Sequence, residues 1–110
     1  MGTDPKHYSG LIEILLNENA EFGDRDDAAM NLSDYDNPDV EKALFLIASS
    51  AKADDDLSDT CGESLAEIWC RKKKINFEMF NRLNSTSKNV ALKTIEAICP
   101  GLERQGSNLD

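Results

Sequence analysis

The chain has 110 residues, 40 % of them hydrophobic and 30 % charged, and its formal net charge is −9. This composition is typical of one soluble globular domain with a modest core, and it disfavours a nucleic-acid-binding protein, which needs a net basic face. Three prolines and six glycines are few for the turns of an all-β fold, and no apolar run approaches the roughly 20 residues that cross a bilayer.

Two helices are predicted in the first third of the chain. The first begins at Asp4–Pro5 and ends near Asn17, and its apolar residues recur at helical spacing. The second begins at residues 23–24, and three carboxylates lie near its N-terminus, where the helix dipole favours anions. These carboxylates belong to Asp24, Asp26 and Asp27. Together the two helices form one predicted antiparallel hairpin.

The central part of the chain, from Asn37 to Trp69, predicts a second hairpin. Asn37 is expected to be the N-cap of its first helix and Pro38 to occupy the first helical position, where proline breaks no intrahelical hydrogen bond. This helix ends near Lys52. A charged turn follows that contains Asp54, Asp55 and Asp56, and the second helix then runs from about residue 58 to residue 73.

A third hairpin is predicted in the last third of the chain. A basic run at residues 71–74 precedes it, a short helix follows from about residue 76 to residue 83, and a longer helix runs from about residue 87 to residue 99. Pro100 and Gly101 end this last helix, because proline lacks an amide donor and glycine is common just past a helix end. Residues 101–110 form a predicted polar tail.

One pattern of residues recurs in the second helix of each predicted hairpin. In the central hairpin a small residue, a small or polar residue and two large apolar residues follow at helical spacing: Cys61, Ser64, Leu65 and Ile68. The pattern returns 33 residues earlier and 30 residues later, at Ala28, Asn31, Leu32 and Tyr35, and at Ala91, Thr94, Ile95 and Ile98. Three helix pairs are enough for a short solenoid. The sequence therefore predicts an all-α fold of about six helices, with residues 1–100 as one helical-repeat domain.

Acidic residues are concentrated in the first half of the chain: residues 1–60 carry a net charge of −11, and residues 61–110 carry +2. In a stack of hairpins the turns within each pair share one edge, so seven aspartates are expected side by side. They are Asp24, Asp26, Asp27, Asp54, Asp55, Asp56 and Asp59. Helix capping explains some of these aspartates, but it does not explain the row at 54–56, because one cap needs one carboxylate and adjacent carboxylates repel. A calcium site is disfavoured, because the sequence lacks the alternating ligands of a calcium-binding loop. We expect an acidic edge that attracts a basic partner.

No catalytic or metal-binding motif stands out in the sequence. The chain has one histidine, His7, and contains neither a glycine-rich phosphate loop nor a Gly-x-Ser-x-Gly sequence. We expect no enzymatic activity, no cofactor and no metal. The three cysteines are odd in number and lack Cys-x-x-Cys spacing, so Cys61 and Cys99 are expected to be buried free thiols and the protein to work in the cytoplasm.

These features resemble a known group of proteins. Residues 61–68, with the sequence CGESLAEI, look like the second helix of a HEAT-like repeat, and residues 8–100 resemble a bacterial immunity protein. The resemblance implies a short right-handed stack of antiparallel helix pairs, a HEAT-like α-solenoid. It also implies a partner: the cognate toxin domain of a contact-dependent growth inhibition system or another polymorphic toxin, many of which are nucleases with basic clefts. The chain would be a monomer within a heteromeric complex, with no direct contact to nucleic acid or membrane.

The resemblance implies that the acidic edge occludes the substrate-binding surface of the toxin. The expected contact residues are the seven aspartates, with Tyr35 and Trp69 as aromatic anchors, because aromatic side chains often dominate binding interfaces. For Trp69 the alternative is packing beneath the basic run. The alternative function is a HEAT-like adaptor or regulatory subunit, which would bind another protein through apolar residues of its concave groove.

Overall fold

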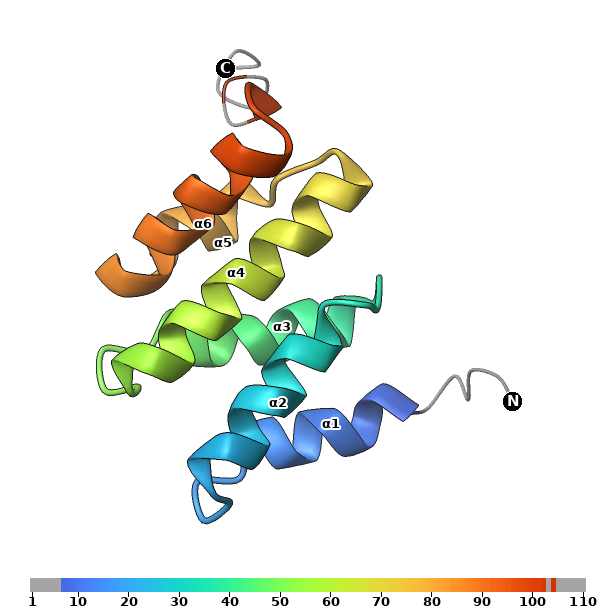
Figure 1. The fold of residues 1–110 in the computed structure, drawn as a ribbon, viewed down its shortest axis with the longest axis vertical. Coiled ribbons are helices and arrows are strands. Elements are labelled where there is room, and N and C mark those ends of the chain that lie inside the picture. Colours follow the sequence, from blue (N-terminus) through green and yellow to red (C-terminus); the bar gives the residue numbers. More distant parts are fainter. Residues whose placement is uncertain (1–6, 103, 105–110) are drawn as a thin grey trace.

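The computed structural model describes residues 7–102 and 104, and it is built from α-helices (Figure 1). Within these residues there are six helices and no strand. They are α1 (His7–Leu16), α2 (Phe22–Leu32), α3 (Pro38–Ala48), α4 (Asp55–Lys72), α5 (Phe77–Arg82) and α6 (Ser85–Ile98). The prediction of an all-α fold is therefore confirmed.

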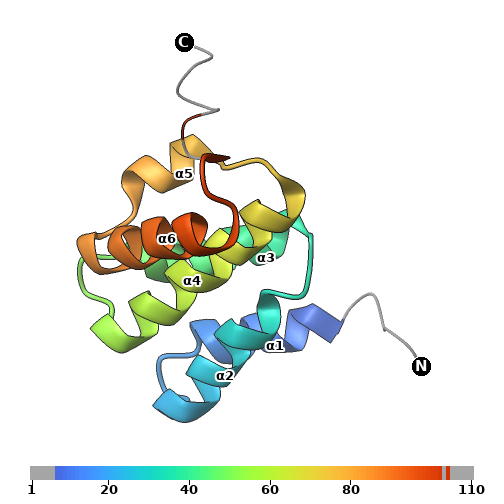
Figure 2. The same ribbon diagram turned by 45° about the horizontal axis from the view of Figure 1, so that its top comes forward.

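Helix α4 is the longest, with 18 residues, and the other helices are arranged around it. Helices α2 and α6 pack along its two sides and α3 packs behind it, while α1 contacts both α2 and α3 (Figure 1). Figure 2 shows α5 beside α6, on the side away from α2. The buried apolar side chains form one continuous core, to which α4 contributes more than any other helix.

Side-chain caps fix where the two central helices begin. Asn37 caps α3, as predicted: its Oδ1 accepts a hydrogen bond of 2.8 Å from the amide two residues later, and Pro38 occupies the first helical position. Helix α4 begins three residues earlier than predicted, because Asp54 is its N-cap and accepts a hydrogen bond of 2.8 Å from the Asp56 amide. One of the three adjacent carboxylates therefore has a structural role.

The repeated sequence pattern occupies matching places in the core at two of its four positions. Its small first residues and large third residues are all buried: Ala28, Leu32, Cys61, Leu65, Ala91 and Ile95. The fourth position differs, because Ile68 is buried whereas Ile98, at the end of α6, is 56 % exposed. Tyr35 lies beyond the end of α2 and is half-buried. The pattern therefore holds where the three helices meet and fades toward the ends of the outer two.

Helices α4 and α6 lie so close together that only glycine fits at one contact. A Cβ atom on Gly62 would lie 2.6 Å from the carbonyl oxygen of Ser87 and 2.8 Å from Cγ1 of Val90. On the side of α4 that faces α2, Ser64 Oγ donates a hydrogen bond of 2.8 Å to the carbonyl of Ala29. Because interaxial distance depends on the side chains at the contact, these small residues set both spacings around α4.

Replacing Gly62 by alanine is expected to lower the free energy of unfolding by about 1–3 kcal/mol, because the new methyl group overlaps the backbone of α6. This clash outweighs the roughly 1 kcal/mol that alanine gains over glycine inside a helix. Gly10→Ala in α1 is the matched control, since its Cβ would meet no atom within 4 Å, and it should be neutral or stabilising. Urea unfolding followed by circular dichroism measures both. Equal effects of the two substitutions would contradict the close approach.

Hydrogen bonds hold the start of α6 against the end of α3. The Oδ1 of Asn84 caps α6 by accepting from the Ser87 amide at 2.8 Å, while its Nδ2 donates to the Ser50 carbonyl at 2.9 Å and to Ser58 Oγ at 3.0 Å. The carbonyl of Ala48 accepts from the Asn84 amide at 2.8 Å and from Ser87 Oγ at 2.6 Å. Asn84 thus joins α3, α4 and α6, and it pairs polar groups that would be costly to bury alone.

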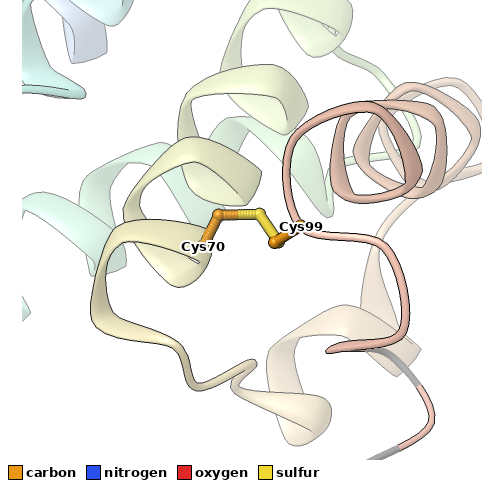
Figure 3. The surroundings of a disulfide bond; sticks show 2 residues. All are labelled: Cys70 and Cys99. Carbon is orange, nitrogen blue, oxygen red and sulfur yellow. A yellow bond between two sulfur atoms is a disulfide. The ribbon is translucent and has the colours of Figure 1, made fainter.

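A disulfide bond between Cys70 and Cys99 joins the end of α4 to the end of α6 (Figure 3). The sequence prediction of a free thiol at Cys99 is therefore wrong, because folding brings two cysteines together that are 29 residues apart in the chain. Cys61 is free and buried, as predicted. Since disulfides persist mainly in oxidising compartments, the cysteines no longer support the cytoplasmic location.

The two ends of the chain are described only in part. The predicted helix start at Asp4–Pro5 and residues 105–110 of the predicted polar tail lie outside the described residues. Within that tail, Leu102 is buried and packs into the core with a 7 % exposed surface. Among the described helices, none combines the length and the apolar character that crossing a membrane requires.

Candidate functional site

The starts of α2 and α4 lie next to each other. The acidic segments at these two starts, residues 24–27 and 54–59, therefore form one surface. Thr60 Oγ1 in α4 donates a hydrogen bond to Oδ1 of Asp26 in α2. The turn between α1 and α2 and the turn between α3 and α4 are at the same end of the two hairpins (Figure 1). We call this surface the acidic edge, and it contains Asp24, Asp26, Asp27, Asp54, Asp55, Asp56 and Asp59.

Three of these seven aspartates form hydrogen bonds within the fold. Asp54 caps α4, Asp26 is half-buried beside Thr60, and Oδ1 of Asp55 accepts a hydrogen bond of 3.2 Å from Oγ1 of Thr86 at the start of α6. The other four are exposed, and their carboxylates form no such hydrogen bond with the described residues: Asp24, Asp27, Asp56 and Asp59. These four are therefore the carboxylates best placed to meet a partner.

Two glutamates that the sequence analysis missed extend the acidic edge along α4. Glu63 and Glu67 follow Asp59 at intervals of four residues, so all three lie on one helix face. Partial burial raises the pKa of Glu63, and the neighbouring carboxylates Glu67 and Asp59 raise it further. The folded chain thus binds this proton more tightly than the unfolded chain, so stability declines as the pH rises from the unfolded toward the raised folded pKa. The four-residue spacing of Asp59, Glu63 and Glu67 is the sequence signal that could have identified these two glutamates.

The structure does not bring the two predicted aromatic anchors to the acidic edge. Trp69 is 1 % exposed, and its Nε1 donates a hydrogen bond of 3.1 Å to Oε1 of buried Glu41. Tyr35 is half-buried, and its ring centroid is 5.8 Å from that of Tyr8. Trp69 lies in the C-terminal part of α4, and Tyr35 follows the end of α2, whereas the N-termini of these helices form the edge. The distance along α4 from its N-terminus to Trp69 is about 20 Å. Trp69 therefore packs in the core and not at the acidic edge.

The basic run lies at the opposite end of α4 from the acidic edge, and part of its charge is neutralised within the chain. Arg71 forms an ion pair with Asp36, and Lys72 Nζ lies 2.7 Å from Oε2 of Glu41. These pairs tie the end of α4 to the segment that leads into α3 and to α3 itself. Two of the four cations of the run are therefore paired within the chain, and the remaining two are few for a phosphate-binding face.

Among the residues that the structure describes, no group of three or more histidine, cysteine, aspartate or glutamate side chains is arranged to hold a metal ion. The arrangement of the acidic edge therefore suits long-range attraction and hydrogen bonding to a cationic surface. Comparison of the chain with protein-family models, curated proteins and solved structures finds no match.

Proposed function

We propose that this protein is a bacterial immunity protein that binds and neutralises a cognate toxin domain. One observation carries the proposal: α2 and α4 bring two acidic segments together at one end of the fold, with Asp24, Asp27, Asp56 and Asp59 exposed.

The proposed mechanism is occlusion of the toxin's substrate-binding surface. A nuclease-type toxin binds phosphates through a basic cleft, and an acidic edge would compete for the same cations as a mimic of the charged substrate. Exposed pairs at the rim of such a contact contribute little each, so the affinity would come from several carboxylates together. The protein itself would perform no catalysis and would bind as a monomer within the complex.

We further propose that the three helix pairs are HEAT-like repeats that form a short right-handed stack. Burial of the small and large pattern residues at corresponding places in α2, α4 and α6 supports this interpretation. The six-residue α5 is the least regular part, since it has no buried residue. The stack would leave the turns within each pair free to form the binding edge.

Affinity capture from the native cell tests the proposed function. The bait is the tagged full chain, washed at low and at high salt, and the variant carries Asp56→Lys with Asp59→Lys. We expect capture of one basic toxin domain, with affinity reduced about tenfold or more by the double substitution and reduced by salt, because exposed charge pairs are screened. Glu13→Lys with Glu96→Lys is the matched control, since both residues are exposed on other helices and the net charge changes equally.

The alternative function is an adaptor that binds through an apolar groove. A groove between α1 and α3 favours this alternative, because Tyr8, Ile12, Leu16 and Leu46 line it and Leu46 is 53 % exposed. The outer face of α4, by contrast, carries Asp59 and Glu63. A captured partner that is released by Ile12→Arg, and not by charge reversal at the acidic edge, would favour the adaptor over the immunity protein.

A further inference from the structure

A hollow with both apolar and polar walls lies between the turn that joins α1 to α2 and the turn that joins α3 to α4. Its volume is about 530 Å³, within the range of roughly 300–1,000 Å³ that is typical of ligand pockets. Its apolar lining comes from the ends of α1 and α3 and the start of α4: Leu16, Leu46, Ile47 and Leu57. The hollow therefore borders the acidic edge, to which the proposed function assigns binding, and shares Asp54 with it.

Two of these leucines are exposed although their side chains are large and apolar. Leu16 is 37 % exposed and Leu46 is 53 % exposed, whereas Leu57 is 2 % exposed and forms part of the floor. Apolar surface that is exposed next to a rim of polar residues is a frequent mark of a protein interaction site. The hollow thus offers a partner an apolar contact that the carboxylates cannot provide.

Charge around the hollow indicates what kind of partner fits it. Two carboxylates and two cations line the hollow itself: Glu18, Asp54, Arg25 and Lys52. The segments 18–27 and 52–59 around it together carry nine carboxylates and the same two cations, a net charge of −7. Of the two cations, Arg25 donates a hydrogen bond of 2.9 Å from Nε to the carbonyl of Leu15, and Lys52 lies in the turn. A cationic partner is therefore attracted here, while a second copy of this chain would present the same negative edge and be repelled.

We propose that this hollow accepts one large apolar side chain from a basic segment of the partner, with the acidic edge around it binding the flanking cations. The inference rests on the proposed function, because it describes the recognition element of the toxin at the same surface. A buried apolar anchor inside a polar rim is the arrangement in which a few residues supply most of the binding energy. The carboxylates then orient the partner, and the hollow supplies much of the affinity.

Two synthetic peptides, Lys-Lys-Trp-Lys-Lys and Lys-Lys-Gly-Lys-Lys, test the hollow without the toxin. Titration at low salt is followed by the methyl and amide NMR signals of the full-length protein. We expect the tryptophan peptide to bind at least about fivefold more tightly and to shift the methyl signals of Leu16 and Leu46. Leu46→Ser should remove this advantage, whereas Ile14→Ser, at a residue that is 39 % exposed on α1 and does not line the hollow, should preserve it.

Equal affinity of the two peptides, or a tryptophan advantage that survives Leu46→Ser, would overturn the inference. Failure of the proposed function looks different, because it would appear as a missing toxin in the capture experiment while the peptide results still stand. Conversely, a captured toxin that is released by charge reversal and is unaffected by Leu46→Ser would keep the proposed function and reject the apolar anchor.

Discussion

Trp69→Ala is expected to lower the free energy of unfolding by about 3–5 kcal/mol, because the indole ring fills the centre of the core. The ring is 1 % exposed and lies edge-on to Phe80 of α5, with 6.5 Å between the ring centroids. A loss of this size is a large fraction of the 5–15 kcal/mol that typically stabilises a domain. Urea unfolding measured by circular dichroism provides the test, since the variant lacks the only tryptophan of the chain.

Trp69→Phe separates packing from hydrogen bonding. Phenylalanine keeps much of the apolar volume but removes the Nε1 donor, which leaves Oε1 of Glu41 without its 3.1 Å hydrogen bond. We expect a smaller loss, of about 1–3 kcal/mol, which is the usual cost of a buried polar group left unpaired. A loss for Trp69→Ala below that for Trp69→Phe would show that the ring is not a core residue.

Removal of the disulfide by Cys70→Ala with Cys99→Ala is expected to cost about 3–4 kcal/mol. The bond closes a loop across 29 residues, so it restricts the unfolded chain far more than the folded one. Unfolding midpoints with and without a reductant measure the effect: the wild type should lose stability on reduction, and the double variant should not respond. A wild-type midpoint that ignores the reductant would contradict the disulfide.

Cys61→Ala is the control for the disulfide experiment. Burial, and then the nearby carboxylate of Asp26, raises the pKa of the Cys61 thiol to about 12, although Arg25 acts in the opposite direction. The thiolate is the attacking species in disulfide exchange, so Cys61 is not expected to rearrange the bond in the folded protein. Cys61→Ala should therefore leave the response to reductant unchanged, and unreduced wild-type protein in denaturant should show one free thiol per chain.

Local sequence signals predicted much of the fold, because helix caps and helical periodicity depend on neighbouring residues. Asn37 and Pro38 marked the start of α3 correctly. The predicted start of α4 is three residues too late, because three adjacent aspartates are typical of a turn, whereas Asp54 is the N-cap and the helix begins at Asp55. The requirement for glycine at Gly62 and the pairing of Cys70 with Cys99 could not be predicted, because both depend on how α6 lies against α4.

The same distinction applies to the candidate site. The two acidic segments were identified from charge, and the hydrogen bond between Asp26 and Thr60 shows them side by side. The apolar hollow between them was not predicted, because Leu16 and Leu46 are distant in sequence and each fits an ordinary apolar helix face. For Trp69 the sequence leaves both an anchor and a packing role open, because it does not show which side of α4 faces the core.

The disulfide also keeps the protein in one covalent piece if the backbone is cut between Cys70 and Cys99. Every peptide bond between Cys70 and Cys99 lies inside the loop that the disulfide closes, and that loop includes all of α5. A protease that cuts at Lys74 or Arg82 would leave two pieces joined by sulfur, with α6 still attached to the rest of the protein. The nicked molecule would run as a single species until a reducing agent separated its parts.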